Sequence, residues 1–473
     1  MFAAAASPGW AMPRFGRPGT YAVDGSPVGV RAAALQSSSA RDLLTANEAG
    51  EEGPSLSFLF NRGSGSFFPE QRMGLNAAKY ILHAVAAGDF NADGRGDIAV
   101  AVDDISDFPV RGAVLVYRNN GNGFANPVTY NLSGFFPQCI EAVDVTGDGV
   151  LDLVVCHARG TGGSSQGLIT VLAGQKTGNT PNGNFTQIYS DVVGTAPASV
   201  AAGDADGDGH ADLLVVDPAE QRVLILYGNT GATHFDSPAE LDTVTGPVAA
   251  LPQDIPSQPL PQVLVLSTSG GRLLTYRQSE ARIFSALPNP QQIAIAPTTM
   301  ALRDFDANGI DDLMVLSGSG ADLWYGAADG TFSFGESLVH DTTLDALEIA
   351  DLNGDGRLDV AASDSTKDRV TVILNGTDVP STPAPTPTIT LTPTITRTPP
   401  PTMTRTPGGA CTGDCNRDGM VSINELISGV NIALGNAAVG TCGPFDSDGD
   451  GTVAINELIA GVKNAQNGCA PAT

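Results

Sequence analysis

The stretch GDFNADGRGD, residues 88–97, places four Asp or Asn residues and three Gly within ten positions. Carboxylates packed this closely repel one another unless a cation lies among them. The same pattern returns at intervals along the chain, each time directly before a short apolar run that is typical of a β-strand. This recurrence, more than any single copy, indicates the fold.

Five copies keep the acidic residues. They begin at Asp89, Asp144, Asp204, Asp304 and Asp351, which are 55, 60, 100 and 47 residues apart. The gap of 100 residues is two periods, and a worn copy, DIPSQPLPQ, begins near its middle at Asp254. Another worn copy, ALQSSSARD, begins at Ala34. Several strands repeated about every 50 residues are typical of a β-propeller, so the sequence predicts an all-β fold of seven blades over residues 15–377.

The two ends of this region predict how the ring closes. Residues 15–23, FGRPGTYAV, resemble residues 124–132, FANPVTYNL, which form the last strand of a complete unit. The seventh unit ends at residues 370–376 without such a strand. We therefore expect the N-terminal strand to complete the last blade, which removes an open sheet edge. The alternative is a linear array of separate β modules.

The repeated loop has the pattern of a calcium site. Positions 1, 3, 5 and 9 supply side-chain oxygens, position 7 supplies a backbone carbonyl, and Gly at position 6 permits a tight turn. Ca²⁺ takes roughly six to eight oxygen ligands, whereas transition metals favour His or Cys. The alternative is a set of Asx-turns with solvated acids. About five ions are expected, with these ligands: Asp89, Asn91, Asp93, Arg95, Asp97; Asp144, Thr146, Asp148, Val150, Asp152; Asp204, Asp206, Asp208, His210, Asp212; Asp304, Asp306, Asn308, Ile310, Asp312; Asp351, Asn353, Asp355, Arg357, Asp359.

These units resemble the FG-GAP or VCBS-type repeats, the calcium-loop blades that also occur in integrin α-subunits. The resemblance covers most of residues 15–377, although the Phe-Gly and Gly-Ala-Pro signatures of the family are largely absent. It implies an extracellular recognition or adhesion module that binds a glycan or a protein and holds calcium for structural purposes. The triplet Arg95-Gly96-Asp97 invites an adhesion-ligand interpretation, which we reject because Asp97 is the ninth-position ligand and should face inward.

Beyond the repeats, residues 378–408 are dominated by Pro and Thr and predict an extended linker. Residues 409–473 hold two twelve-residue loops of EF-hand type, each followed by a helix-like run. This tail resembles a dockerin domain, which implies a cohesin-like or surface partner; it departs from that family in having Glu at position 12 of both loops and four cysteines. The alternative is a small calcium-stabilised domain without a docking partner. Two further ions are expected, on Asp414, Asn416, Asp418, Met420 and Glu425, and on Asp446, Asp448, Asp450, Thr452 and Glu457.

The amino-acid composition indicates which partners and which cellular compartment to expect. The chain carries 51 Asp and Glu against 24 Lys and Arg, for a net charge of −27, which argues against nucleic acid and anionic membranes. No apolar run approaches the roughly 18 residues of a membrane span. Four of the six cysteines lie in the tail and favour disulfides over a weak zinc pattern, while Cys139 and Cys156 could pair or be buried singly. We expect a secreted or surface protein, although residues 1–14, expected to be disordered, form a poor secretory signal.

Catalytic motifs are lacking in the sequence. The five His residues have no partner at a recognisable spacing, and there is no nucleophile elbow, HExxH motif or phosphate loop. We therefore expect a protein that is not an enzyme. The alternative is a propeller lyase or glycosidase that belongs to a polysaccharide-degrading assembly, with a site built from several blades at the central channel.

Overall fold

The computed structural model describes residues 15–36, 40–50, 53–106, 110–160, 166–231, 234–241, 245–340, 342–376, 411–415, 421, 423–433, 439, 442–448 and 450–467. Residues 1–14 and the predicted linker 378–408 lie outside the described residues. The chain divides into two compact units, residues 1–382 and 383–473. No helix among the described residues is long and apolar enough to cross a membrane.

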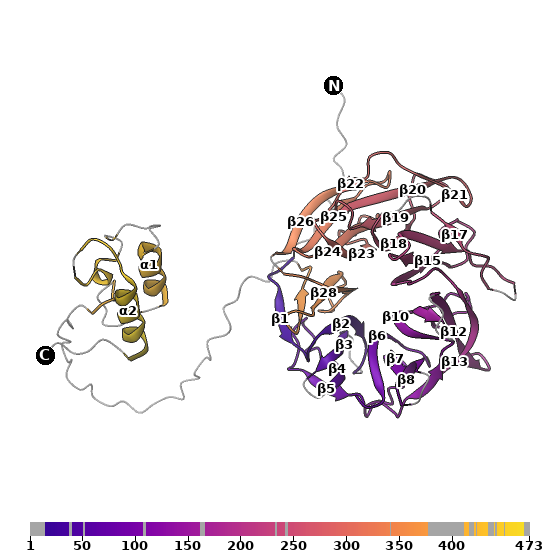
Figure 1. Ribbon diagram of the computed structural model, residues 1–473, viewed down its shortest axis with the longest axis horizontal. Helices are drawn as coiled ribbons and strands as arrows, with labels where there is room; N and C mark the ends of the chain where they lie inside the picture. The colour runs from indigo at the N-terminus through magenta and orange to yellow at the C-terminus, as the bar shows by residue number, and fades with distance from the viewer. Residues whose placement is uncertain are drawn as a thin grey trace, which may run out of the picture. The chain divides into compact units, whose positions relative to one another are not determined.

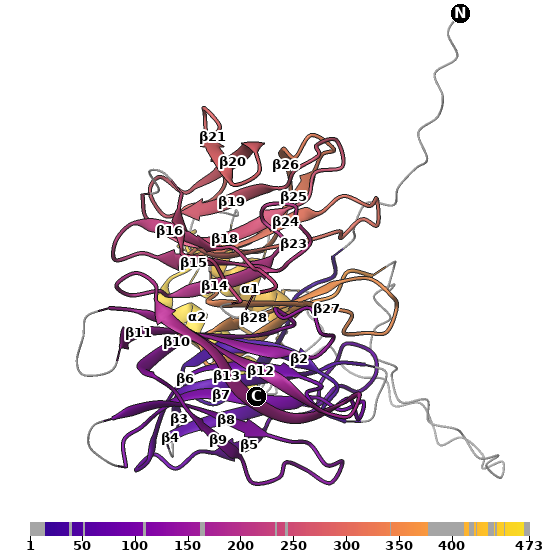
Figure 2. The same ribbon diagram turned by 90° about the vertical axis from the view of Figure 1, so that its right-hand side faces the viewer.

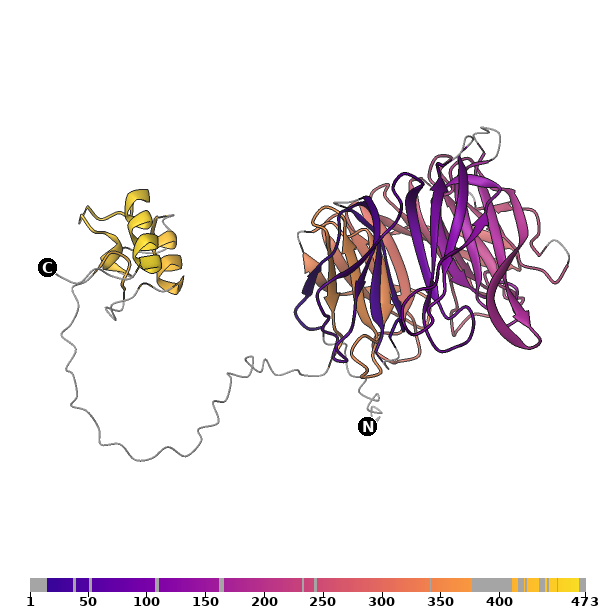
Figure 3. The same ribbon diagram turned by 90° about the horizontal axis from the view of Figure 1, so that it is seen from below.

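The first unit is a ring of seven antiparallel sheets around a central channel (Figure 1). Each sheet is one blade of four strands, and the fifth blade adds a short extra strand, β22, beside β20. Figures 2 and 3 view the ring from two further sides. The predicted all-β seven-bladed propeller is thus confirmed, and the worn copies at Ala34 and Asp254 are blades like the others.

The strands follow one another around the ring, blade by blade. Blades 1 to 3 comprise β2 (Pro27–Ala33), β3 (Asp42–Gly50), β4 (Gly53–Leu59), β5 (Gln71–Gly74); β6 (Tyr80–Gly88), β7 (Asp97–Asp104), β8 (Arg111–Tyr117), β9 (Val128–Asn131); β10 (Gly134–Val143), β11 (Asp152–Gly160), β12 (Leu168–Thr177), β13 (Thr180–Val192). Blades 4 and 5 comprise β14 (Ser199–Gly203), β15 (Asp212–Asp217), β16 (Arg222–Leu226), β17 (Ala239–Glu240); β18 (Pro247–Gln253), β19 (Gln262–Ser267), β20 (Arg272–Glu280), β21 (Ile283–Ala286), β22 (Gln291–Gln292). Blades 6 and 7 comprise β23 (Pro297–Arg303), β24 (Asp312–Ser317), β25 (Gly320–Gly326), β26 (Phe332–His340); β27 (Ala346–Ala350), β28 (Asp359–Asp364), β29 (Arg369–Ile373), β1 (Gly19–Ala22).

The ring closes as the sequence predicts. The N-terminal strand β1 pairs antiparallel with β29, with Gly19 opposite Val372 and Ala22 opposite Arg369. A further bridge joins Phe15 to Asn375. Figure 3 shows the indigo N-terminal strand beside the orange strands of this last blade. The two ends of the propeller therefore share one sheet, and the linear-array alternative is wrong.

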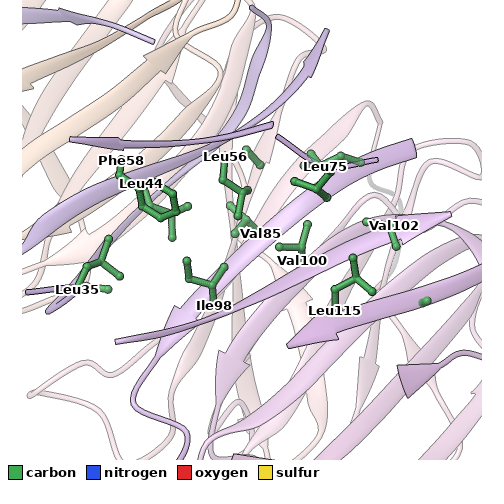
Figure 4. Close-up of a cluster of buried hydrophobic side chains, with 14 residues drawn as sticks. Leu35, Leu44, Leu56, Phe58, Leu75, Val85, Ile98, Val100, Val102 and Leu115 are labelled. Atoms are coloured by element: carbon green, nitrogen blue, oxygen red, sulfur yellow. The ribbon is translucent and has the colours of Figure 1, made fainter. Parts of the chain in front are cut away.

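The core lies between the blades. Within the described residues, one cluster of buried apolar side chains occupies each junction between neighbouring blades. At the junction of blades 1 and 2, Leu44 and Leu56 of blade 1 face Val85 and Val100 of blade 2 (Figure 4). The middle strands are covered on both faces, which explains why they are continuous apolar runs. This packing fixes where each strand begins and so where each acidic loop lies.

The second unit contains two helices, α1 (Ile423–Ala433) and α2 (Ile455–Asn467), and a short 3-10 turn, η3 (Gly443–Phe445). Phe445 is fully buried between the helices. A Cβ atom at Gly429 or Gly461 would lie 2.6 or 2.5 Å from its ring, so both helices need glycine there. Residues 450–454 of the second predicted loop lead directly into α2, whereas residues 416–420 of the first predicted loop lie outside the described residues.

Disulfides occur in both units. Cys139 of β10 is bonded to Cys156 of β11, which settles the choice that the sequence left open for this pair. In the second unit Cys415 is bonded to Cys442, and Cys411 is also disulfide-bonded. Cys469 lies outside the described residues.

Candidate metal centres

The five acidic loops share one backbone conformation. Each connects the inner strand of a blade to its second strand, and Gly at position 6 has φ between 82° and 86° in all five, a left-handed conformation that favours glycine. The first-position carboxylate accepts hydrogen bonds from the N–H groups of positions 5 and 6, at 2.7–3.2 Å. The fifth-position side chain accepts the N–H of position 7 at 2.7–2.9 Å. These hydrogen bonds fix the side-chain oxygens of positions 1 and 5 against the backbone of their own loop.

The ninth-position aspartates also connect their loop to the third strand of the same blade. Their side chains are fully buried, and each accepts one N–H from position 2 of its own loop and another from a residue near the end of the third strand, at 2.7–3.1 Å. Burial, together with repulsion from neighbouring loop acids, raises the pKa of Asp97, Asp212, Asp312 and Asp359 to about 6. Burial also raises the pKa of Asp152. A cation beside these groups would favour their charged form.

Carboxylates converge most closely in two propeller loops. Oxygens of Asp204, Asp206 and Asp212 all lie within 4.8 Å of one another, and the same holds for Asp304, Asp306 and Asp312. The other three loops carry Asn91, Thr146 or Asn353 at position 3, so fewer of their ligands are charged. An all-oxygen donor set around a flexible loop fits Ca²⁺. The seventh-position residues, including His210, would contribute only a carbonyl.

The second loop of the tail has the same construction. Asp446 accepts the N–H groups of Asp450 and Gly451 at 3.1 and 3.0 Å, and Gly451 has φ of 84°. Oxygens of Asp446, Asp448 and Glu457 lie within 4.8 Å of one another. Hydrogen bonds from Ala454 and Ser447 lower the pKa of Glu457, so it stays charged. These residues could hold one calcium ion.

The first tail loop is described only in part. Glu425 accepts the N–H of Cys415 at 2.8 Å, which matches the bond from Ser447 to Glu457 in the second loop. Asp414 is buried. The predicted ligands Asn416, Asp418 and Met420 lie outside the described residues. Calcium binding at all these positions stays a prediction.

Basic side chains lie against the acids of three loops, which the sequence did not reveal. Arg282, from the β20–β21 hairpin of blade 5, contacts Asp206 at 2.5 Å and Asp208 at 3.4 Å, and its guanidinium lies over the ring of Tyr227. Two pairs closer in sequence, Arg95 with Asp93 and Lys176 with Asp148, lie at 3.3 and 3.5 Å. The acidic loop of blade 4 is therefore contacted by an arginine of blade 5, the blade whose own loop is the worn copy at Asp254.

In blades 1, 2 and 7, an asparagine that follows the third strand links its own blade to the loop of the preceding blade in the ring. The amide of Asn119 donates to the carbonyl oxygen of Leu35 in blade 1 at 2.7 Å, while its backbone N–H donates to Asp97. Asn61 and Asn375 make the equivalent bonds to the carbonyls of Leu352 and Phe305. We call these three residues the Asn clamps. Each Asn clamp forms an isolated β-bridge to a Phe. For Asn61 and Asn119 this Phe ends a Gly-containing turn, such as NNGNGF, and such a turn is only a weak sequence signal for the clamp.

The worn loop of blade 1 keeps one functional acid. Asp42 stands at its ninth position, is fully buried, and accepts N–H groups of Gln36 and Asn61, both at 2.8 Å. The sequence alone suggested a loop stripped of its acids, which is wrong at this position. A ninth-position acid therefore belongs to the blade architecture even where the other acids are gone.

The adhesion triplet is inaccessible as a ligand. Asp97 has no exposed surface, and Arg95 bonds to Asp93 of its own loop. An Arg-Gly-Asp ligand must present both charged ends to its receptor. The rejection of the triplet as an adhesion motif is confirmed.

Known proteins are similar to this chain in its propeller. The FG-GAP-like repeat family matches residues 304–362. Integrin alpha-4 of Xenopus laevis is 27% identical over 179 residues, a match that covers 35% of this chain and 16% of that protein. The chain thus spans about a sixth of that relative's length.

Solved structures share the fold. The crystal structure of BBS1N in complex with ARL6DN, soaked with lead, matches with a TM-score of 0.50 at 14% identity, covering 75% of this chain and 94% of that one. The same complex soaked with mercury matches with a TM-score of 0.48 at 13% identity, covering 77% and 98%. At 14% identity, the match to the lead-soaked complex shows the fold alone. The first unit is thus a seven-bladed β-propeller that matches the FG-GAP-like repeat family over residues 304–362, and the chain resembles integrin alpha-4 over part of its length.

Proposed function

We propose that the chain is a calcium-binding recognition protein of the cell exterior, whose propeller binds a glycan or protein ligand and whose tail attaches it to a partner. The observation that carries the proposal is the FG-GAP propeller with its similarity to integrin alpha-4. All five acidic loops lie where inner strands end, and the ligand is proposed to bind at the opposite end of the ring. The disulfides support an oxidising compartment.

Calcium is proposed as a structural ion in the loops. The converging carboxylates of the loops that begin at Asp204, Asp304 and Asp446 support this. Calorimetric titration of the full chain should give several sites that prefer Ca²⁺ to Mg²⁺, and Asp304→Asn with Asp306→Asn should remove one of them. EGTA should lower the melting temperature strongly. An unchanged melt in EGTA contradicts the calcium proposal.

The tail is proposed to dock through helix α2. Ile455, Ile459 and Val462 are 76%, 62% and 43% exposed, and their spacing places them on one face of the helix. An exposed apolar face suits a cohesin-like or other surface partner. Binding of the full chain to immobilised cohesin domains, compared with the variant Ile455→Ser and Ile459→Ser, tests this. Equal retention of both proteins would contradict docking through this face.

We propose that the propeller is not catalytic, but one observation favours the enzyme alternative. Glu348 of β27 and Glu141 of β10 both line the central channel, and burial raises the pKa of Glu348 to about 7. A carboxyl group of near-neutral pKa suits a general acid. Release of reducing ends from polysaccharides by the full chain, abolished by Glu348→Gln, would decide for the enzyme.

Recognition itself is tested by capture. The full chain, immobilised in Ca²⁺, is exposed to purified surface polysaccharides and to surface proteins, and bound material is eluted with EGTA. We expect saturable capture of one class. Absence of capture from both classes contradicts the recognition proposal.

A further inference from the structure

The end of the central channel opposite the acidic loops is shaped by β-bulges. In five blades the register between the inner strand and its neighbour slips by one residue at the same place. Such bulges turn a side chain to a new direction. The bulged residues of blades 1 to 3, Val28, His83 and Gln138, line a cavity of about 680 Å³ inside the ring. Two of the three carry hydrogen-bonding side chains.

The cavity is lined by small side chains and by charged side chains. Ala84, Ala201 and Ala249 are among its lining residues. Three residues after the bulge, the inner strands of blades 1, 2 and 3 carry Arg31, Ala86 and Glu141. Because Ala86 is small, the side chain of Arg31 extends past blade 2 and forms an ion pair with Glu141 at 3.0 Å. A volume of this size is typical of a small-molecule site, and here polar atoms contribute more of the lining surface than apolar atoms do.

Phe136, whose ring contacts that of the cavity-lining His83, has an unusual backbone conformation. Phe136 has φ of 53°, which strains a bulky residue, yet its ring stays 37% exposed. The buried carboxylate of Asp103 accepts the N–H of Phe136 at 2.9 Å and lies 3.0 Å from Nε2 of His83. The rings of His83 and Phe136 are 6.2 Å apart, edge to face. The bulge and the buried carboxylate together hold an aromatic ring, an imidazole and the amide of Gln138 at one mouth.

We propose that this mouth binds the uncharged end of a glycan chain. The face of Phe136 packs against the C–H face of a sugar ring, and His83 and Gln138 hydrogen-bond its hydroxyl groups. The cavity admits the end of a chain, whereas a protein surface needs a broad contact of roughly 1,200 Å² or more. The inference rests on the proposed recognition function and names its ligand class.

Charge selects against acidic ligands. The cavity is lined by four acids and two bases: Glu141, Asp311, Asp345, Glu348, Arg31 and Arg303. The whole chain carries a net charge of −27. Phosphorylated, sulfated or uronic-acid glycans are therefore repelled, and neutral sugars are left as ligands.

The experiment uses the full chain in Ca²⁺ and immobilised neutral oligosaccharides: glucans, mannans, galactans and chitin fragments. The strongest binder is then titrated against Phe136→Ala, Gln138→Ala, the conservative Phe136→Trp, and Phe334→Ala. Phe334 of β26 is the matched control because it is a 55% exposed Phe on another blade. We expect Phe136→Ala and Gln138→Ala to weaken binding about tenfold or more, and Phe136→Trp and Phe334→Ala to stay within about twofold of the unsubstituted chain, with unchanged melting.

The outcomes separate this inference from the function on which it rests. Glycan binding that none of the mouth variants weakens overturns the inference but leaves recognition standing. Capture of a protein with no neutral glycan bound does the same. A chain that binds neither glycan nor protein overturns both.

Discussion

The Asn clamp of blade 2 offers a direct test of how the ring is held together. Asn119→Ala removes the side-chain NH2 group that reaches blade 1, and with it the side-chain oxygen that accepts the N–H of Gly121 at 3.0 Å in its own turn. The carbonyl oxygen of Leu35 loses its donor at 2.7 Å, and that of Gly96 loses a longer one at 3.3 Å. Asn119 is only 3% exposed, so water cannot easily replace the amide.

The expected cost follows from these two carbonyls. A buried polar group left without a partner costs about 1–3 kcal/mol, so the loss of two should lower the unfolding free energy of the variant by about 2–6 kcal/mol. Proteins are stable by about 5–15 kcal/mol, so this is a large fraction of the total. The matched control is Asn120→Ala, because Asn120 is exposed and its side chain accepts only the neighbouring N–H of Asn122. It should change stability by less than about 0.5 kcal/mol.

Urea unfolding of the full chain in Ca²⁺, followed by tryptophan fluorescence and circular dichroism, measures both variants. The midpoint of Asn119→Ala should fall well below that of Asn120→Ala, with a similar slope. If the two midpoints coincide, the amide bond between blades contributes nothing, and the clamp interpretation fails. Asn61→Ala and Asn375→Ala should behave like Asn119→Ala.

Three further predictions concern charge and packing. In the Ca²⁺-free chain the folded state holds protons on Asp97, Asp212, Asp312 and Asp359 more strongly than the unfolded state does, because their pKa is about 6 against 3.8; the melting temperature should therefore fall as pH rises from about 4 to 6, and a rise would contradict the burial of these groups. Arg282→Gln should strengthen Ca²⁺ binding at the loop that begins at Asp204 roughly tenfold, as measured by calorimetry, because a unit positive charge about 5 Å from a divalent ion costs about 1.7 kcal/mol in water. The control Arg222→Gln should leave this affinity unchanged, because Arg222 pairs with Glu240 instead. Gly461→Ala should destabilise the tail by about 1–3 kcal/mol in its melt, because the new Cβ would lie 2.5 Å from Phe445, while Gly443→Ala, with nothing within 4 Å, should be neutral.

Much of the fold follows from local sequence patterns. The five loops identify themselves because Asp, Gly and the following apolar run recur at one period. The strand of residues 15–23 could be placed in the last blade because the same pattern ends a complete unit at residues 124–132. Each of these inferences compares short segments with one another, and the blades are similar because each must pack against the same kind of neighbour.

Contacts between distant segments could not be predicted in this way. Arg282 meets Asp206 from 76 residues away, and Asn119 meets Leu35 from 84 residues away. Arg31, Glu141 and Glu348 reach one channel only because the ring brings blades 1, 3 and 7 around it. The local sequence around these residues does not indicate their contacts, because only the closed ring brings their partners close to them.

Comparison of Asp42 with Asp97 isolates what a cation would do. Both carboxylates are fully buried, both accept backbone N–H groups, and burial raises the pKa of both. Only at Asp97 do loop acids, Asp93 and Asp89, raise the pKa further. The ninth-position acid alone is thus compatible with a blade, whereas the ninth-position acid together with its loop acids carries repulsion that a bound Ca²⁺ would offset. Chelation should therefore weaken the five acid-bearing blades and leave blade 1 unaffected. Hydrogen exchange in EGTA measures this directly: amides at the start of β7 should exchange faster, and those at the start of β3 should not.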